Sequence, residues 1–514
     1  MASQLLPHGD SAGTILGHPK GLFVLFFAEM WERFSYYGMR ALLIFYLTKH
    51  WLFSDSEAGV IYGAYTALVY ITPVLGGYLA DKYLGQRKAV TYGAVLLTFG
   101  HFLMGFEGNG GQDPSSLNIF WLALAFIIVG SGFLKANISV IVGQLYPRTD
   151  VRRDGAYTIF YMGINLGAAI GSLLCGYLGE TYGWAYGFGA AGIGMLLGLI
   201  VFVGFKGLLL GRGEPPALLS KGMEWGLYAV GLVAVVVCWW MVQNQSVVGT
   251  LLGVAGAILV GYVLFTAVVK LPAEDRDRIF AALFLILGSI LFWALFEQAG
   301  SSLNLYTDRY VDRGGVPASV FQSINAIYIV LLAPLFATLW TWLGRRGLEP
   351  SAPAKFGLAL MQLGAGFLVL VAGAATGNMT PVIFIFLIYL LHTTGELCLS
   401  PVGLSAMNRL APAHMASLIM GTWFFASATG NFAAGLIASA TGSEAAAGEG
   451  AGKQVVLDVY SQIGWIAIAV GVGVLLVSPL IKKLMHLDTL KDENLAGEEE
   501  IGEPQAGGVR PAAS

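Results

Sequence analysis

The sequence is poor in charged residues and in cysteine. Only 11% of its 514 residues are Asp, Glu, Lys or Arg, whereas 56% are hydrophobic. A soluble globular domain carries about 25% charged residues, so the composition excludes an ordinary soluble protein and predicts a polytopic membrane protein. The three cysteines, Cys175, Cys238 and Cys398, lie within apolar runs. They are too few for a disulfide framework and are expected to be small buried side chains.

The sequence also has no grouping of His, Cys and Asp with the spacing of metal ligands, and its aspartates lie almost wholly in loops. A membrane enzyme would need clustered carboxylates for a metal, or a nucleophile beside a base. The formal net charge of −3 gives no indication of nucleic-acid binding. We therefore expect no metal site and no nucleic-acid partner, and nothing in the sequence sets the oligomeric state.

Long apolar runs, by contrast, recur along the whole chain. A helix needs about 20 mainly apolar residues to cross a bilayer. Such runs predict an all-α membrane protein with fourteen spans, near 22–48, 57–80, 89–106, 117–137, 156–178, 184–205, 225–242, 248–269, 279–299, 318–342, 356–375, 380–404, 415–440 and 459–481. The 69 glycines suit close packing of helices in lipid.

The spans are expected to form two six-helix halves with a hairpin inserted between them. Polar stretches at 206–224 and 270–278 flank two spans that contain almost no polar side chains. The basic turn at 76–88 also resembles, weakly, a basic turn at the equivalent place in the second half, at 342–347. Repeated halves around a central site are common in transporters. The expected segments are an N-terminal cytoplasmic segment (1–20), a first bundle (21–206), a linker with a hairpin (207–277, spans near 225–242 and 248–269), a second bundle (278–486) and a disordered acidic cytoplasmic tail (487–514).

The distribution of basic residues predicts that both termini are cytoplasmic. With this orientation most of the 28 Lys and Arg residues fall on the cytoplasmic side, as the positive-inside rule requires. The polar start of the chain is followed by an apolar segment longer than the core of a signal peptide, so the first span is expected to remain in the mature protein.

The first span carries an unusual stripe of charge. Glu29, Glu32, Arg33, Tyr36 and Arg40 fall within about 100° of one another around a helix. An unpaired charge at mid-membrane costs about 2.5–3.5 kcal/mol, and such residues normally mark an ion or substrate pathway. The alternative is a structural Glu29–Arg33 pair, which would leave Glu32 and Arg40 to find partners on other helices.

Further ionisable residues lie inside later spans, at Lys135, Glu297 and Glu396. Outside the hairpin these spans are the fourth, seventh and tenth, and with the first they are corresponding members of three-helix units. A central cavity lined by the same element of each unit would bring these charges together.

Several motifs carry a resemblance to one known family. The segment AEMWERFSYYG (28–38) matches the pattern E-x-x-E-R-F-x-Y-Y-G of the proton-coupled oligopeptide transporter family, a branch of the major facilitator superfamily. Two more signatures agree, GGYLADKYLGQRKAVTYGAVLLTFG (76–100) and YTIFYMGINLGAA (157–169). Shorter matches, GFLKANIS, FWALFEQ, FQSINAIY and GELCLSPVG, extend the likeness over nearly the whole chain.

The resemblance implies the major facilitator fold, with two six-helix bundles and the extra hairpin found in bacterial members. It implies import of di- and tripeptides, and of peptide-like drugs, by symport with protons across the bacterial inner membrane, with no cofactor. A carrier of another small solute, such as nitrate or a modified amino acid, on the same fold is the alternative. A receptor without transport is weakened by the absence of a sizeable soluble signalling domain.

The resemblance also implies roles for particular residues. The peptide carboxylate would meet Tyr36, Tyr37, Arg40 and Lys135; the amino end and backbone would meet Asn165, Asn325, Glu396 and Ser400; side-chain pockets would be shaped by Tyr70, Trp293 and Trp423; and protonation would be coupled to movement by Glu29, Glu32, Arg33 and Glu297. It implies salt bridges between Arg40 and Glu297 and between Lys135 and Glu396. Glu297 is the preferred proton switch, and a permanent brace to Arg40 is its alternative.

Three further residue interpretations remain open. Asn165 and Asn325 suit helix-to-helix bonding as well as ligand contact. The cytoplasmic loop with Asp81, Arg87 and Lys88 is expected to gate the cavity, although a basic loop on the cytoplasmic side needs no such role. His392 lies on the face of Glu396 and is expected to be satisfied by a backbone carbonyl.

Overall fold

The computed structural model describes residues 13–147, 150–442 and 449–490. Within these ranges the chain is almost entirely helical, and fourteen long helices correspond to the fourteen predicted spans. Eleven helices of the described chain are long and apolar enough to cross a membrane. The other three long helices, α1, α3 and α14, are more polar and pack among them. The predicted acidic tail lies mostly outside the described residues.

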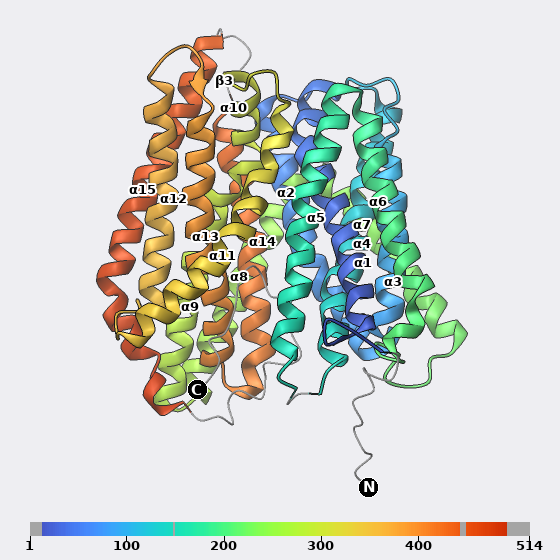
Figure 1. Ribbon diagram of the computed structural model, residues 1–514, viewed down its shortest axis with the longest axis vertical. Coiled ribbons are helices and arrows are strands. Elements are labelled where there is room, and N and C mark those ends of the chain that lie inside the picture. The colour runs from blue at the N-terminus through green and yellow to red at the C-terminus, as the bar shows by residue number, and fades with distance from the viewer. Residues whose placement is uncertain (1–12, 148–149, 443–448, 491–514) are drawn as a thin grey trace.

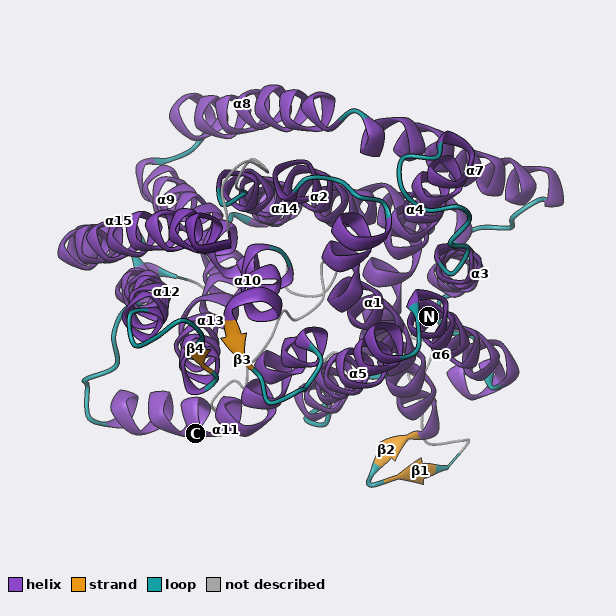
Figure 2. Ribbon diagram, turned by 90° about the horizontal axis from the view of Figure 1, so that it is seen from above, coloured by secondary structure: helices purple, strands orange, loops and turns teal. Residues whose placement is uncertain are grey.

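The first half contains six helices, and the inserted hairpin contains two. The first half comprises α1 (Lys20–Phe45), α2 (Asp55–Leu79), α3 (Gln86–Met104), α4 (Pro114–Gln144), α5 (Arg153–Thr181) and α6 (Trp184–Gly204), and the hairpin comprises α7 (Lys221–Gln243) and α8 (Gln245–Lys270). Short π-helical segments extend α1 (Tyr46–His50) and α2 (Ala80–Leu84), and a 3-10 turn (Lys206–Leu209) follows α6. Seen from above, α7 and α8 lie along one outer face of the molecule (Figure 2).

The second half contains α9 (Ala273–Phe296), the short α10 (Ser302–Tyr310), α11 (Ser323–Arg345), α12 (Ala352–Ala374), α13 (Ile383–Leu410), α14 (Ala416–Ala440) and α15 (Glu449–Leu484). Its 3-10 turns are η5 (Glu297–Gly300), η6 (Ala318–Gln322), η7 (Ala413–Met415) and η8 (Leu487–Thr489). Two small sheets pair β1 (Thr14–Ile15) with β2 (His18–Pro19), antiparallel, and β3 (Val311–Asp312) with β4 (Thr380–Pro381), parallel. The start of α1 and the end of α15 lie at one end of the molecule, and α10 and β3 at the other (Figure 1).

Local sequence explains where several helices begin. Ser54 forms a capping box with Glu57 at the start of α2, with its hydroxyl 3.2 Å from the Glu57 amide. Asp113 accepts from the Ser116 amide, and Pro114 follows at the first position of α4, where its missing N–H removes no helical bond.

The seventh span outside the hairpin is broken, which the sequence did not predict. The helix α9 ends at Phe296, the chain continues through the turn η5, and α10 follows. A side chain at Gly300 would overlap the Tyr62 hydroxyl, so only glycine allows the turn to approach α2 this closely. The break places Glu297 at the start of the turn, where its side chain is buried.

The two halves pack together along α2 and α14 and along α5 and α11. On the first of these seams Gly63 and Gly435 lie face to face, and a Cβ on Gly435 would be 2.6 Å from the Gly63 Cα. Small residues let two helix backbones approach closely in lipid.

Candidate functional site

A cavity lies between the two halves, near the middle of their length. Its walls come from α1, α2, α4 and α5 on one side, and from α9, η5, η6, α11 and α13 on the other. It contains about 1070 Å³ of empty space, including the part open to solvent.

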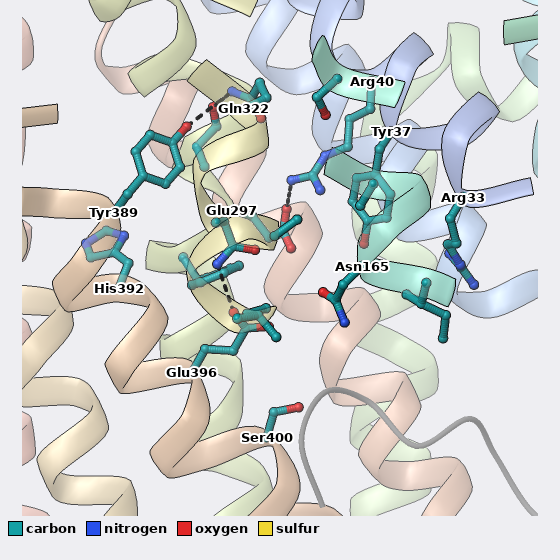
Figure 3. Close-up of a pocket in the computed structure, with 18 of the residues that line it drawn as sticks. Arg33, Tyr37, Arg40, Asn165, Glu297, Gln322, Tyr389, His392, Glu396 and Ser400 are labelled. Atoms are coloured by element: carbon teal, nitrogen blue, oxygen red, sulfur yellow. Dashed lines mark hydrogen bonds and ion pairs between the residues drawn. The ribbon is translucent and has the colours of Figure 1, made fainter. Parts of the chain in front are cut away.

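Charge of opposite sign lines the two walls. Arg33, Arg40 and Lys135 line the cavity from the first half, whereas Glu297 and Glu396 line it from the second half. Figure 3 shows Arg33 and Arg40 on one side and Glu396 on the other. The cavity can therefore contact an anionic group and a cationic group of one ligand at the same time.

Arg40 and Glu297 form an ion pair that joins the halves, as the resemblance implied. The Arg40 Nε also donates to the Tyr62 hydroxyl at 2.6 Å, and both charged side chains are mostly buried. A pair in this position holds α1 against the broken span. Its role in proton coupling stays a prediction.

Lys135 and Glu396 line the same cavity, but they do not form the predicted ion pair in this conformation. Glu396 Oε2 accepts from Asn325 Nδ2 at 3.0 Å, and this carboxylate forms no salt bridge with any residue the structure describes. The Lys135 ammonium lies 4.3 Å from the centre of the Tyr70 ring. The prediction of a direct pair is wrong here because the cavity separates the wall built by α4 from the wall built by α13.

The charges nearest the start of α1 form a compact buried group. Arg33 Nε lies 2.8 Å from Glu29 Oε1 and 3.1 Å from Glu32 Oε2, and all three side chains are at most 3% exposed. Glu32 therefore has one partner on its own helix, because Arg33 is one residue away and reaches it. The Glu29–Arg33 pair and the wider charged group exist together, so the structural alternative and the functional one are both compatible with the geometry.

One end of the molecule is closed by contacts between the halves. The Asn304 amide donates to the Ala41 carbonyl at 3.0 Å, Arg309 makes two bonds to Asp55 at 2.5 and 2.9 Å, and Lys49 pairs with Asp308 at 2.8 Å. Ser319 also donates to Glu180, through its amide at 3.0 Å and its hydroxyl at 2.6 Å. These contacts, together with the bond from the Ser56 hydroxyl to the Ser439 carbonyl at 2.8 Å, lie at the level of the Arg40–Glu297 pair or toward this closed end.

The comparisons with known proteins agree with this architecture. Residues 87–454 match the family model PTR2, described as POT family. The chain belongs to the POT family. It is similar to the uncharacterised transporter YclF of Bacillus subtilis (38% identity over 91% of this chain and 95% of YclF) and to the peptide transporter YePEPT of Yersinia enterocolitica (38% over 82% and 88%). A crystal structure of a mutant of peptide transporter POT in complex with alafosfalin superposes with a TM-score of 0.80, at 35% identity, covering 93% of this chain and 98% of that one.

Membership of the POT family identifies a multi-pass membrane transporter rather than an enzyme. It also confirms the predicted fold class, since the solved relatives share the arrangement of helices over almost the entire chain.

Most of the predicted site residues line the cavity. They are Arg33, Tyr37, Arg40, Tyr70, Lys135, Asn165, Trp293, Glu297, Asn325, Glu396 and Ser400. Four do not. Glu29, Glu32 and Tyr36 are buried residues of α1 in the first half, and Trp423 is fully buried in the second half.

The position of Trp423 has a simple steric cause. Its indole occupies the space that a side chain at Gly403 would fill, and it packs 6.3 Å from the Phe356 ring. It therefore forms part of the core of the second half. The prediction that it shapes a side-chain pocket is wrong for this conformation.

The two predicted asparagines use their amides differently. Asn165 donates to the Tyr161 carbonyl of its own helix at 3.2 Å. Asn325 donates across to α13, to the Thr393 hydroxyl at 2.9 Å and to Glu396. Helix-to-helix bonding thus applies to Asn325, which nonetheless lines the cavity.

Several cavity residues were not predicted, including Tyr161, Gln322 and Tyr389. Tyr389 continues the helical stripe of His392, Glu396 and Ser400 at intervals of three and four residues, so this spacing could have identified it. Tyr161 lies one turn before Asn165. His392 contacts the Leu363 carbonyl at 3.2 Å as predicted, and its ring also borders the cavity (Figure 3).

Three polar groups of cavity-lining residues have no hydrogen-bond partner in the described chain. They are the Tyr161 hydroxyl, the Trp293 indole N–H and the Ser400 hydroxyl. Buried polar groups are normally hydrogen-bonded, so these three groups are left unsatisfied in this conformation.

Two residues of the predicted gating loop are paired with the segment that joins the two halves. Arg87 pairs with Glu214 at 2.5 Å, and Lys88 pairs with Glu224 at 3.0 Å. Asp81 accepts from Gln86 at 2.6 Å. Hydrogen bonding to the Arg87 guanidinium lowers the pKa of Glu214 below its usual range. Gating by this loop stays a prediction.

Proposed function

We propose that this POT-family chain is a proton-coupled symporter that imports di- and tripeptides by alternating access. The observation that carries the proposal is the division of charge between the walls of the cavity, with cations on the first half and carboxylates on the second. Every short peptide is a zwitterion, so a site that accepts many sequences has to recognise its carboxylate and its ammonium. The peptide transporter relatives and the bound alafosfalin of one solved structure support peptides and peptide-like drugs as cargo.

Each wall has a chemical role in this proposal. Arg40 and Lys135 bind the peptide carboxylate with charge-assisted hydrogen bonds, and Glu396 binds the ammonium. Asn165 and Asn325 can contact the amino end and the backbone of the peptide. A bound peptide then bridges the two halves, which favours closure of the cavity around it.

The residues around this zwitterion site have the chemistry to receive side chains. Tyr70 and Trp293 present aromatic faces to the cavity, while Trp293, Tyr161 and Ser400 offer polar groups that have no other partner in the described chain. This combination suits side chains of varied size and polarity.

Glu297 is the proposed proton switch. Its ion pair with Arg40 joins the halves at the level of the cavity. Protonation would remove the carboxylate charge and release Arg40 for the peptide carboxylate, so proton binding and cargo binding would act on one residue. If one proton enters with a neutral peptide, a potential of 100 mV supplies about 2.3 kcal/mol, or roughly fifty-fold accumulation.

We place the chain in a bacterial inner membrane with both termini cytoplasmic, on the basis of its basic residues. In that orientation the closed end faces outward, and the cavity would open toward the cytoplasm. Protons would be the coupling ion, with no cofactor.

The test is uptake of labelled dialanine into proteoliposomes, with an inward proton gradient and with an uncoupler. We expect accumulation above equilibrium that the uncoupler abolishes. Glu297→Gln should retain exchange of dialanine but lose concentrative uptake. Glu57→Gln is a matched control, because Glu57 is exposed and glutamine can keep the capping contact at Ser54.

Two results would contradict the proposal in different ways. If folded protein moves no dialanine under any gradient, the cargo is another small solute, such as nitrate or a modified amino acid. If Glu297→Gln accumulates dialanine as the wild type does, Glu297 is a structural brace and not the switch.

A further inference from the structure

Thr393 is a fully buried residue of α13 that lies outside the cavity lining. It precedes Glu396 by one turn, and both are hydrogen-bonded to one amide from α11. Asn325 Nδ2 donates to the Thr393 hydroxyl at 2.9 Å and to Glu396 Oε2 at 3.0 Å. The contact at Glu396 is drawn in Figure 3.

These two bonds determine which end of the Asn325 amide meets a ligand. A side-chain amide has two N–H donors and one carbonyl acceptor. In Asn325 the nitrogen is directed to α13, so the carbonyl oxygen is the group left for the cavity. The reverse orientation of the amide would direct its carbonyl oxygen at Glu396. An ionised Glu396 would repel that oxygen, so this orientation is disfavoured.

A single contact would not fix the amide equally well. The terminal torsion of asparagine is broad, so an amide bonded only to Glu396 could turn about that contact. The second anchor at Thr393 removes this freedom. Thr393 cannot swing away itself, because its side chain is 0% exposed and β-branched.

We propose that Thr393 is a positioning residue that holds Asn325 as a hydrogen-bond acceptor beside Glu396, so that the two recognise the peptide ammonium together. An ammonium group has three N–H donors and no acceptor, so it favours a carboxylate and a carbonyl oxygen side by side. This inference rests on the proposed peptide transport, and it adds a residue that does not touch the cargo.

The experiment compares Thr393→Val with Thr393→Ser in proteoliposomes. Valine keeps the shape and removes the hydroxyl, whereas serine keeps the hydroxyl. Thr394→Val is the matched control, because the Thr394 hydroxyl donates to the Leu391 carbonyl of its own helix, at 3.0 Å. Inhibition of labelled dialanine uptake is measured with unlabelled dialanine and with N-propionylalanine, which has the same skeleton without the amino group.

We expect Thr393→Val to raise the KM for dialanine roughly 3- to 10-fold, the effect of one hydrogen bond, with little change in maximal rate. The preference for dialanine over N-propionylalanine should fall by the same factor. Thr393→Ser and Thr394→Val should keep both values near those of the wild type. If Thr393→Val yields no folded protein, Thr393→Ala, which leaves space instead of filling it, takes its place.

An unchanged preference for the amino group in Thr393→Val would overturn the inference, as would an equal loss of affinity for both compounds, since that would show a merely structural effect. Failure of the proposed function is distinguishable, because in that case the wild type itself would not transport dialanine.

Discussion

The glycine seam between α2 and α14 gives the sharpest test of how the closed end is stabilised. A Cβ on Gly435 would lie 2.6 Å from the Gly63 Cα and 2.7 Å from the Gly59 carbonyl oxygen. Carbon atoms in contact are normally about 3.5–4.0 Å apart, so Gly435→Ala would require the two helices to separate by roughly 1 Å.

This substitution has a steric cost in the closed conformation, and we expect that cost to disappear when α2 and α14 separate. Overpacking costs about 1–3 kcal/mol, which corresponds to a change of about 5- to 150-fold in the ratio of closed to open states. Gly421→Ala on the same helix is the control, because a Cβ there would meet no atom within 4 Å.

Distances between spin labels would report the change. Leu52 and Val316 are exposed, at 64% and 41%, on loops of the first and second halves at the closed end. The three native cysteines are buried and should react poorly with the label. We expect Gly435→Ala to add a population with a longer distance, and Gly421→Ala to match the wild type. Identical distributions in all three proteins would refute the argument that this contact stabilises the closed end.

Two further predictions concern ion pairs at the surface. Asp55→Asn should change the ratio of closed to open states, measured with the same spin labels, by less than about fivefold, because Arg309 and Asp55 are partly exposed and such pairs contribute about 0–1 kcal/mol. The difference from the wild type should disappear in about 1 M salt, which screens exposed charges. A difference that persists in this salt would contradict the prediction. Glu214→Gln should speed tryptic cleavage after Arg212 several-fold at pH 7, because it removes the contact of the linker with Arg87. Since the pKa of Glu214 is lowered, the stabilisation by this pair is complete above pH 4.5, the ordinary pKa of a glutamate, and is lost only as the pH falls below that value. The pair is therefore fully formed at pH 7. Equal cleavage of the two proteins at pH 7 would show that the pair does not hold the linker.

The positions of the spans were predictable because hydropathy reports which segments are long and apolar. The short helix α10 was missed for the same reason. Its residues are polar, yet Ser302 bonds to Tyr460 and Gln298, and Asn304 reaches the Ala41 carbonyl of the first half. A polar helix that is buried in protein has no hydropathy signal, and its partners lie far away in the sequence.

The candidate site was predictable to the level of helices and motif residues, but not of individual contacts. The Arg40–Glu297 pair is formed, whereas Lys135 and Glu396 are apart. Both predictions had the same basis, which was the resemblance to the transporter family. Whether two such charges meet depends on how closely the walls approach in a given conformation, and the sequence alone does not specify that distance.

On the proposed mechanism, the proton and the cargo have opposite effects on the contact between the two halves. The pair of Arg40 and Glu297 attracts the halves to each other when the cavity is empty, because each charge would otherwise be buried without a partner. A proton on Glu297 removes that attraction, and a zwitterionic peptide between Lys135 and Glu396 replaces it with a new bridge. Neither ligand alone both releases the old contact and supplies the new one, so obligatory coupling follows from where the five cavity charges lie.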